Sequence, residues 1–202
     1  MTAELVRGQN HPLPDTRLEI RVSAGHPVVA CATCADEQGV VRDEWIAHPG
    51  APVLPGVEVP RKAAEAPRFA FDLDAVPDQV HQVSVLLALP EGAGGPAQFG
   101  STAAPFVAVV AQGGDELASF TITGLESETA LVALEVYRRQ GAWKVRAVGQ
   151  GYAGGLAELL ADQRVARARE TAAAIQGAAA ERASGEVAGE THLDQVLVVQ
   201  QP

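Results

Sequence analysis

The sequence predicts an all-β fold, a two-sheet antiparallel β-sandwich with a C-terminal α-helix. Two observations support this prediction. From residue 17 to residue 148, apolar side chains recur mainly at every second position, which is the period of a β-strand. Turns rich in glycine and proline separate these short runs, as in a sandwich rather than an alternating α/β fold. After Gly155 the apolar spacing becomes helical.

Composition limits the kinds of partner. The chain has 202 residues, of which 47% are hydrophobic, so it can build a sizeable core. Lys and Arg number 15 against 25 Asp and Glu, for a formal net charge of −10. This balance argues against nucleic acid and anionic membranes as partners. No apolar run is long enough to cross a bilayer and the first residues lack the features of a signal peptide, so we expect a cytoplasmic protein without membrane insertion.

The alternating pattern places strands at five positions before the last hairpin. They are residues 17–22, 68–73, 83–89, 106–111 and 117–122. Two stretches interrupt the pattern, residues 49–67 and 90–105, and both are long for loops in a small domain. Long loops often carry function, so these two stretches are candidate walls of a cleft.

A β-hairpin is predicted at residues 131–148, with Gln140 and Gly141 in the turn. This register pairs Arg138 with Trp143 on one face and Glu135 with Arg146 on the other. The four basic residues Arg138, Arg139, Lys144 and Arg146 suggest an anion-binding patch or, the interpretation that we favour, a solvated face with one cross-strand ion pair.

The C-terminal part has the composition of a helix. Leu156, Leu159 and Leu160 have helical spacing, and the alanine-rich stretch to Ala183 favours helix throughout. We expect a sandwich domain at residues 1–163 and a helical extension and tail at 164–202. Residues 184–191 are interpreted as a linker, and residues 193–199 as an apolar tail that could add to a sheet edge. The predicted partners are other proteins, with self-association through the helix or tail as one form.

Cys31 and Cys34 form a C-x-x-C motif. Such a motif can be a redox dithiol or half of a zinc site. The surrounding residues favour a strand, in which positions three apart point to opposite faces, and the sequence has no second cysteine pair. We therefore predict two buried apolar side chains without redox or metal chemistry.

Residues 149–154 spell G-x-G-x-x-G between a strand and a helix. This is the local context of a dinucleotide-binding turn, but no parallel β-strand unit follows and Glu170 falls inside the helix. We interpret the glycines as a tight strand-to-helix turn beneath a packed Tyr152.

Asp72, Asp74 and Asp78 are the strongest acidic cluster. Asp72 and Asp74 are predicted to project from one face of a strand, as a cation site, an acid–base pair or a solvated edge. The histidines are scattered without metal-ligand spacing, and His81 is predicted to be structural within a strand. The positions are His11, His26, His48, His81 and His192. The sequence assigns no catalytic, cofactor-binding or metal-ligating residue.

The order of several segments resembles the TerD family of bacterial tellurium-resistance and stress-response proteins. The resemblance covers residues 5–163, and its most specific part is 147–156. The segments are 5–10, 71–77, 99–100, 128–130, 137–139, 141–144 and 147–156. It implies a cytoplasmic two-sheet sandwich that binds calcium in typical members, and it assigns the G-x-G-x-x-G to a family turn.

Two blocks that supply calcium ligands in typical members are missing. Residues 25–32 occupy the place of the first block and contain no carboxylate. The string at 71–75 spells the same motif but belongs to a later strand. The place of the second block, residues 53–71, offers Glu58 and Glu65, and Glu128 remains elsewhere.

These departures predict a non-catalytic binding or scaffold protein of the TerD type that binds calcium weakly or not at all. Two alternatives remain open. One is a residual calcium site near Asp72 and Asp74. The other is an enzyme whose cleft lies between the 49–67 and 90–105 loops.

Overall fold

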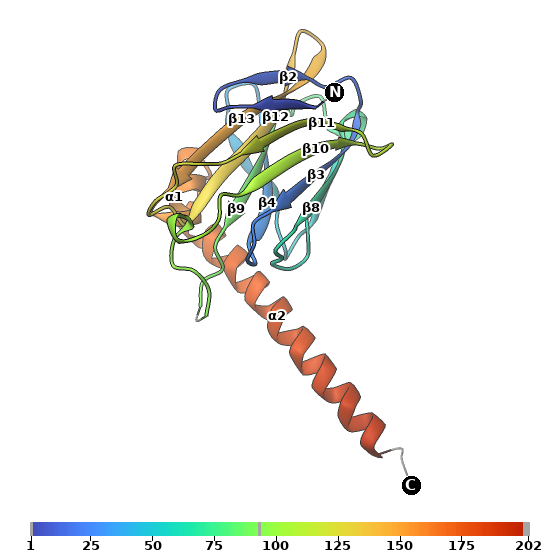
Figure 1. Cartoon of the computed structure of the whole chain (residues 1–202), viewed down its shortest axis with the longest axis vertical. Coiled ribbons are helices and arrows are strands. Elements are labelled where there is room, and N and C mark those ends of the chain that lie inside the picture. Colours follow the sequence, from blue (N-terminus) through green and yellow to red (C-terminus); the bar gives the residue numbers. More distant parts are fainter. Residues whose placement is uncertain (1, 93, 200–202) are drawn as a thin grey trace.

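The computed structural model describes residues 2–92 and 94–199, with side chains to residue 184. Two β-sheets face each other, and two helices follow them (Figure 1). The first sheet has seven strands in the order β1 (Ala3–Leu5), β11 (Glu116–Thr121), β10 (Phe106–Ala111), β3 (Arg17–Ser23), β8 (Arg68–Asp72), β7 (Val57–Glu58) and β6 (Val53–Leu54). The second has six in the order β2 (Asn10–Pro12), β13 (Ala142–Tyr152), β12 (Ala130–Arg139), β9 (Gln82–Ala88), β4 (Val29–Ala35) and β5 (Val41–Ala47).

The described pairings are antiparallel except between β1 and β11, which run parallel. Short 3-10 helices lie at η1 (Leu73–Ala75) and η2 (Phe99–Ser101). The predicted two-sheet sandwich and its strands are confirmed, with boundaries within one or two residues of the expected ones except at the end of the hairpin, where β13 runs to Tyr152 instead of residue 148.

The space between the sheets holds the main core. On β3, Leu18, Ile20 and Val22 are buried while the residues between them are not. They meet Phe69 on β8 and side chains such as Leu87 from the opposite sheet in one cluster. The alternation read from the sequence therefore reports which side of this sheet faces the core.

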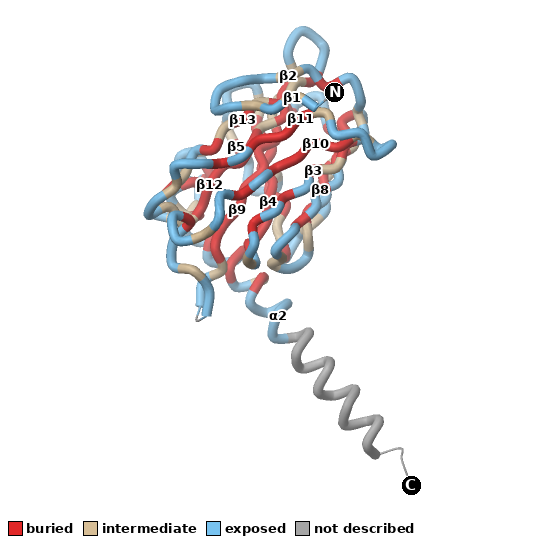
Figure 2. The backbone as a smooth tube through the Cα atoms, in the orientation of Figure 1, coloured by how far each residue is buried: buried red, intermediate tan, exposed pale blue. Residues whose placement is uncertain are grey.

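A second apolar cluster lies on the outward side of the six-stranded sheet. There α1 (Gly155–Asp162) and the first turns of α2 (Ala168–Val199) cover β12, β9 and β4. Leu159 and Leu160 of α1 and Ile175 of α2 are fully buried in this cluster. The residues coloured as buried in Figure 2 therefore continue from the sheet into these helical turns.

The hairpin is confirmed in detail. Arg138 pairs with Trp143 and Glu135 with Arg146, as expected, and Arg146 Nη1 donates to Glu135 Oε1 at 2.6 Å. Gln140 and Gly141 both have positive φ, the geometry of the favoured two-residue turn. Arg138 does not lie on a solvated face, because its guanidinium stacks on Trp143 and donates to backbone carbonyls before β9.

The C-terminal region departs from the prediction in two ways. The chain breaks into two helices, because Arg164 adopts a φ of 64° and ends the first. The second helix continues to Val199, so the linker predicted at 184–191 and the strand-forming tail predicted at 193–199 are wrong. No proline interrupts residues 168–199, and helix propagation is favourable once the first turns are fixed by packing. The division at residue 163 remains a prediction.

In the part of the chain that the structure describes, neither helix has the length and apolar character needed to cross a membrane.

Candidate functional site

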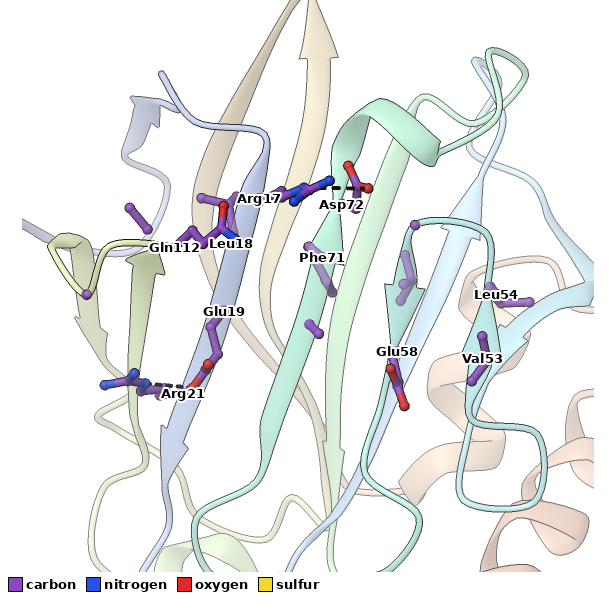
Figure 3. A pocket seen from close by; sticks show the side chains of 15 residues that line it. Arg17, Leu18, Glu19, Arg21, Val53, Leu54, Glu58, Phe71, Asp72 and Gln112 are labelled. Carbon is purple, nitrogen blue, oxygen red and sulfur yellow. Dashed lines mark hydrogen bonds and ion pairs between the residues drawn. The ribbon is translucent and has the colours of Figure 1, made fainter.

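A hollow of about 430 Å³ lies on the outward side of the seven-stranded sheet, over β3, β8, β7 and β6 (Figure 3). Ala70 forms part of its floor because it stands opposite Glu19 on β3 and Glu58 on β7 and has no long side chain. Arg17, Arg21 and Asp72 complete the charged wall. The hollow holds charges of both signs.

Asp72 and Asp74 do not project from one strand face, so that prediction is wrong. Strand β8 ends at Asp72, and Asp74 lies in η1. The chain turns because the Leu73 amide donates to the Thr16 carbonyl and buries Leu73. Asp78 is exposed beyond the turn. The three carboxylates therefore lie in different backbone elements: at the end of a strand, in a 3-10 helix and beyond that helix.

Each carboxylate of the pair already has a neighbour. Arg17 Nε lies 4.0 Å from Asp72 Oδ2, and Thr16 Oγ1 donates to Asp74 Oδ2 at 2.9 Å. Asp72 Oδ1 is shielded from water without a hydrogen-bond partner. Among the described residues, no three acidic, histidine or cysteine side chains gather closely enough to hold a metal ion. A hard cation such as calcium takes six to eight oxygens, so these residues do not fit a tight site.

Gly56 shapes this hollow through its backbone. It has a φ of +79°, and its carbonyl accepts the Asp72 amide hydrogen bond at 2.9 Å. A Cβ at this position would collide with the Asp72 carbonyl and Val76. Glycine therefore lets β7 approach the end of β8 closely.

The other acidic residues left from the family pattern are dispersed. Glu58 Oε1 lies 3.9 Å from Arg61 Nη2 on the exposed surface, and Glu65 is exposed. Glu128 accepts the amide hydrogen bond of Glu126 within its own loop. These carboxylates do not form a second cation site in the described structure.

The G-x-G-x-x-G segment is a strand-to-helix turn, as expected. Residues 149–152 belong to β13, residues 153–154 form the turn, and α1 begins at Gly155. Tyr152 is buried, and its hydroxyl donates to Asp162 Oδ2 at 2.6 Å. Burial and the neighbouring carboxylate raise the pKa of Tyr152.

Both cysteines lie in β4 and are buried free thiols, as the sequence predicts. Cys34 faces the main core, whereas Cys31 faces the helices on the other side of the sheet. Burial raises the pKa of both thiols from 9.0 to about 12. Neither is a reactive thiolate at neutral pH.

His81 lies just before β9 rather than within it. Its backbone amide donates to the Ala35 carbonyl, and its carbonyl accepts from Arg138. His48 is half-buried, and its Nδ1 accepts the Gly50 amide at 3.1 Å. Burial lowers the pKa of His48.

A second hollow, of about 500 Å³, lies between the 90–96 loop and α2, with Ala63 on its margin. Its lining is mostly alanine, glycine and proline, and Glu91 is its one ionisable group. Gln176 fixes the loop: its Nε2 donates to the Leu89 carbonyl at 3.0 Å, and its Oε1 accepts the Glu91 amide at 3.1 Å.

Gln176 was missed by the sequence reasoning, although a lone glutamine among alanines and Ile175 on a packed helix face is a signal for a buried polar contact. Arg7 was missed in the same way. Its guanidinium donates to the carbonyls of Thr123 and Gly149 and ties the N-terminal segment to the sandwich.

Comparison with known proteins decides the family. The TerD domain profile matches residues 57–162, just over half of the chain. This chain belongs to the TerD domain family. The profile match begins after residues 25–32.

Two curated relatives illustrate the similarity. The chain is 38% identical over 91 residues to tellurium resistance protein TerD of Serratia marcescens, which is 44% of this chain and 47% of that protein. It is 33% identical over 93 residues to general stress protein 16U of Bacillus subtilis (strain 168), covering 45% of this chain and 48% of that protein. The chain spans about half the length of the curated relatives it matches.

Solved structures share the fold of this TerD-family chain. A homologue of telluride resistance protein from Streptomyces coelicolor A3(2) has a TM-score of 0.54 and 18% identity, over 68% of this chain and 90% of that one. A crystal structure of a protein of unknown function has a TM-score of 0.58 and 14% identity, over 72% of this chain and 95% of that one.

Proposed function

We propose that this TerD-family chain is a non-catalytic binding or scaffold protein of a bacterial stress response, and that it binds calcium weakly or not at all. The arrangement of Asp72 and Asp74 carries this proposal. Each carboxylate has a neighbour of its own, Arg17 or Thr16, and η1 separates the two residues. Binding an ion there would require breaking these contacts without a concentrated set of oxygens to replace them.

The positions of the perturbed ionisable groups support a role without catalysis. Active sites are where shifted pKa values and concave surfaces usually coincide. The resolved shifts belong to Cys31, Cys34, His48, Arg146 and Tyr152. None of them lines the hollow over β8 or the hollow beside α2.

The proposed role in a stress response is based on the names of the relatives. One is named for tellurium resistance and another as a general stress protein. We extend to this chain a role in such a response, in the cytoplasm and through other proteins or a second copy rather than through a reaction. Self-association through the C-terminal helix, which the sequence analysis gave as one form of partner, stays a prediction. Exposed side chains at residues 180–184 are consistent with a helix that has surface left for a partner.

A weak calcium site at Asp72 is the second candidate. The buried Asp72 Oδ1 without a hydrogen-bond partner favours it, because an unpaired buried oxygen is costly and an ion or water would satisfy it. The nearby carbonyls and the second carboxylate of Asp74 would have to supply the remaining ligands.

Calorimetric titration of calcium into chelator-treated full chain separates the two candidates. The proposal predicts no saturable heat and the same melting temperature with calcium and with chelator. A ligand at a hundredfold over its Kd would stabilise the fold by about 2.7 kcal/mol, which is several degrees for a domain of this size.

Asp72→Asn is the matched variant, because it keeps the shape and removes the charge. A calcium-induced shift in the wild-type chain that Asp72→Asn abolishes would contradict the proposal and establish the second candidate. A shift that survives in Asp72→Asn would contradict both and place the ion elsewhere.

A further inference from the structure

The outward side of the seven-stranded sheet, called here the open face, is not covered by a helix. In Figure 1 the strands β11, β10, β3 and β8 lie in front with no helix across them. The apolar cluster that includes α1 and α2 takes its strand residues from the six-stranded sheet. The open face is therefore a sheet surface without a partner in the described structure.

The large apolar side chains that the described structure leaves exposed gather beside hollows of this face. They are Val6, Val53 and Phe106, which are 61%, 60% and 38% exposed. Val53 lines the hollow over β8. Val6 and Phe106 line another hollow on this face, of about 620 Å³, over β1, β11 and β10. Apolar groups and hollows on one surface are typical of an interaction site.

The centre of the open face is electrically balanced, unlike the chain as a whole. Its outward positions on β3, β8 and β7 carry three arginines and three carboxylates. These residues are Arg17, Arg21, Arg68, Glu19, Glu58 and Asp72. The whole chain carries a net charge of −10. Two copies would repel each other elsewhere, but not through this patch.

Some of the opposite charges at the centre of the open face are paired with each other within the chain. Arg21 Nε lies 2.7 Å from Glu19 Oε1, and Arg68 Nη1 lies 3.4 Å from the same atom. Covering such a group leaves fewer unpaired charges than covering a surface of one sign. A foreign partner that recognised this acidic chain by charge would instead use a surface with an excess of carboxylates.

We propose that the open faces of two copies of this chain pack against each other in a two-fold dimer. A two-fold contact places the same patch of both copies face to face, so a charged patch can serve it only when it carries both signs, as this one does. The exposed apolar side chains of one copy then contact the hollows of the other.

The size of the face indicates a weak dimer. Seven strands about 4.8 Å apart span about 29 Å, and the seven residues of β3 span about 23 Å. The contact is on the order of 600 Å² per copy, somewhat below the typical value of about 800 Å² for stable complexes. We expect association in the micromolar range rather than an obligate dimer.

Sedimentation equilibrium of the full chain over a range of concentrations tests this proposal. Phe106→Glu and Val6→Glu place a charge at exposed positions, so the sandwich should still fold, which circular dichroism and urea unfolding check. Ala173→Glu is the control, because Ala173 is exposed on α2. We expect a wild-type dimer whose Kd rises at least about tenfold in either face variant and is unchanged in Ala173→Glu.

Two results would overturn the proposal. One is a wild-type chain that stays monomeric up to about 1 mM, the range of the weakest specific complexes. The other is a dimer that Ala173→Glu dissociates while both folded face variants keep it, because association would then run through α2.

Discussion

The two outer surfaces of the sandwich are built differently. On the six-stranded sheet, β4 is buried at every position because helices cover its outward side chains. On the seven-stranded sheet, β3 alternates between buried and exposed or half-buried residues. The sequence carries this difference directly: β4 is apolar on both faces except for Thr33, whereas β3 places Arg17, Glu19 and Arg21 between its apolar residues. A strand that is apolar on both faces predicts a covering layer, and a strictly alternating one predicts an open surface.

The largest expected effect comes from removing the cover. A chain that ends after residue 166 loses Ile175 and the buried alanines of α2, so α1 and the sheet residues of the same apolar cluster lose part of their cover. Losing a buried side chain of this size alone costs about 2–5 kcal/mol of unfolding free energy. A chain that ends after Ala179 keeps these contacts and is the control. Urea unfolding should show a much larger loss for the shorter chain, and equal midpoints would contradict this view of α2.

A single substitution on each surface sharpens the same contrast. Leu159→Ala empties a fully buried position on α1 and should cost about 3 kcal/mol of unfolding free energy. Val53→Ala changes a side chain that is 60% exposed and should cost less than about 0.5 kcal/mol. Both values come from urea unfolding. In dilute solution, where the proposed dimer is dissociated, comparable losses would mean that the open face of the single chain is packed as tightly as the helical cover.

Gln176→Leu tests how α2 holds the 90–96 loop. It leaves the Leu89 carbonyl and the Glu91 amide without their partner, and the expected cost is about 1–3 kcal/mol of unfolding free energy. Gln150→Leu, at an exposed position of β13, is the control and should be near neutral. If the two variants unfold at the same urea concentration, these hydrogen bonds do not stabilise the fold.

The two cysteines test whether β4 is covered on both sides. Their thiols have pKa values of about 12, so a thiol reagent at pH 8 should modify neither in the native chain and both after unfolding. Rapid modification of Cys31 alone would show that the helical cover opens. Cys34 is the internal reference, because it faces the core between the sheets.

The smallest expected effect is a pH dependence from His48. Its folded-state pKa lies below the ordinary value of 6.5, so the fold favours the neutral ring that accepts the Gly50 amide hydrogen bond. This stability is fully present above pH 6.5 and is lost as the pH falls from there through the lowered folded-state pKa. Between pH 7.5 and pH 5, the melting temperature should fall less steeply with decreasing pH for His48→Asn than for wild type.

The sheets, the hairpin register and the strand-to-helix turn could be predicted because each follows from local pattern. Alternation places Ile20 inside, and the turn at Gln140 and Gly141 fixes which residues pair. The burial of the cysteines also followed from strand geometry. These properties depend on residues near one another in the sequence.

The errors at Asp74 and Arg138 arose where distant segments decide local structure. Asp74 leaves the strand because Thr16, far away in the sequence, accepts the Leu73 amide hydrogen bond. Arg138 turns inward because carbonyls before β9 accept its hydrogen bonds. The hollow over β8 depends on Ala70 standing between Glu19 and Glu58. No periodicity in a single stretch carries this information.

Carboxylate footprinting tests most directly the claim that the open face, not the helical cover, is the binding surface. The full chain is labelled with a carbodiimide and an amine when dilute and when concentrated, and the modified residues are quantified by mass spectrometry. The account predicts that labelling of Glu58 and Asp72 on the open face falls with concentration, while labelling of the exposed Glu170 and Glu181 on α2 stays constant. Loss of labelling at Glu170 and Glu181 with Glu58 and Asp72 unchanged would contradict it.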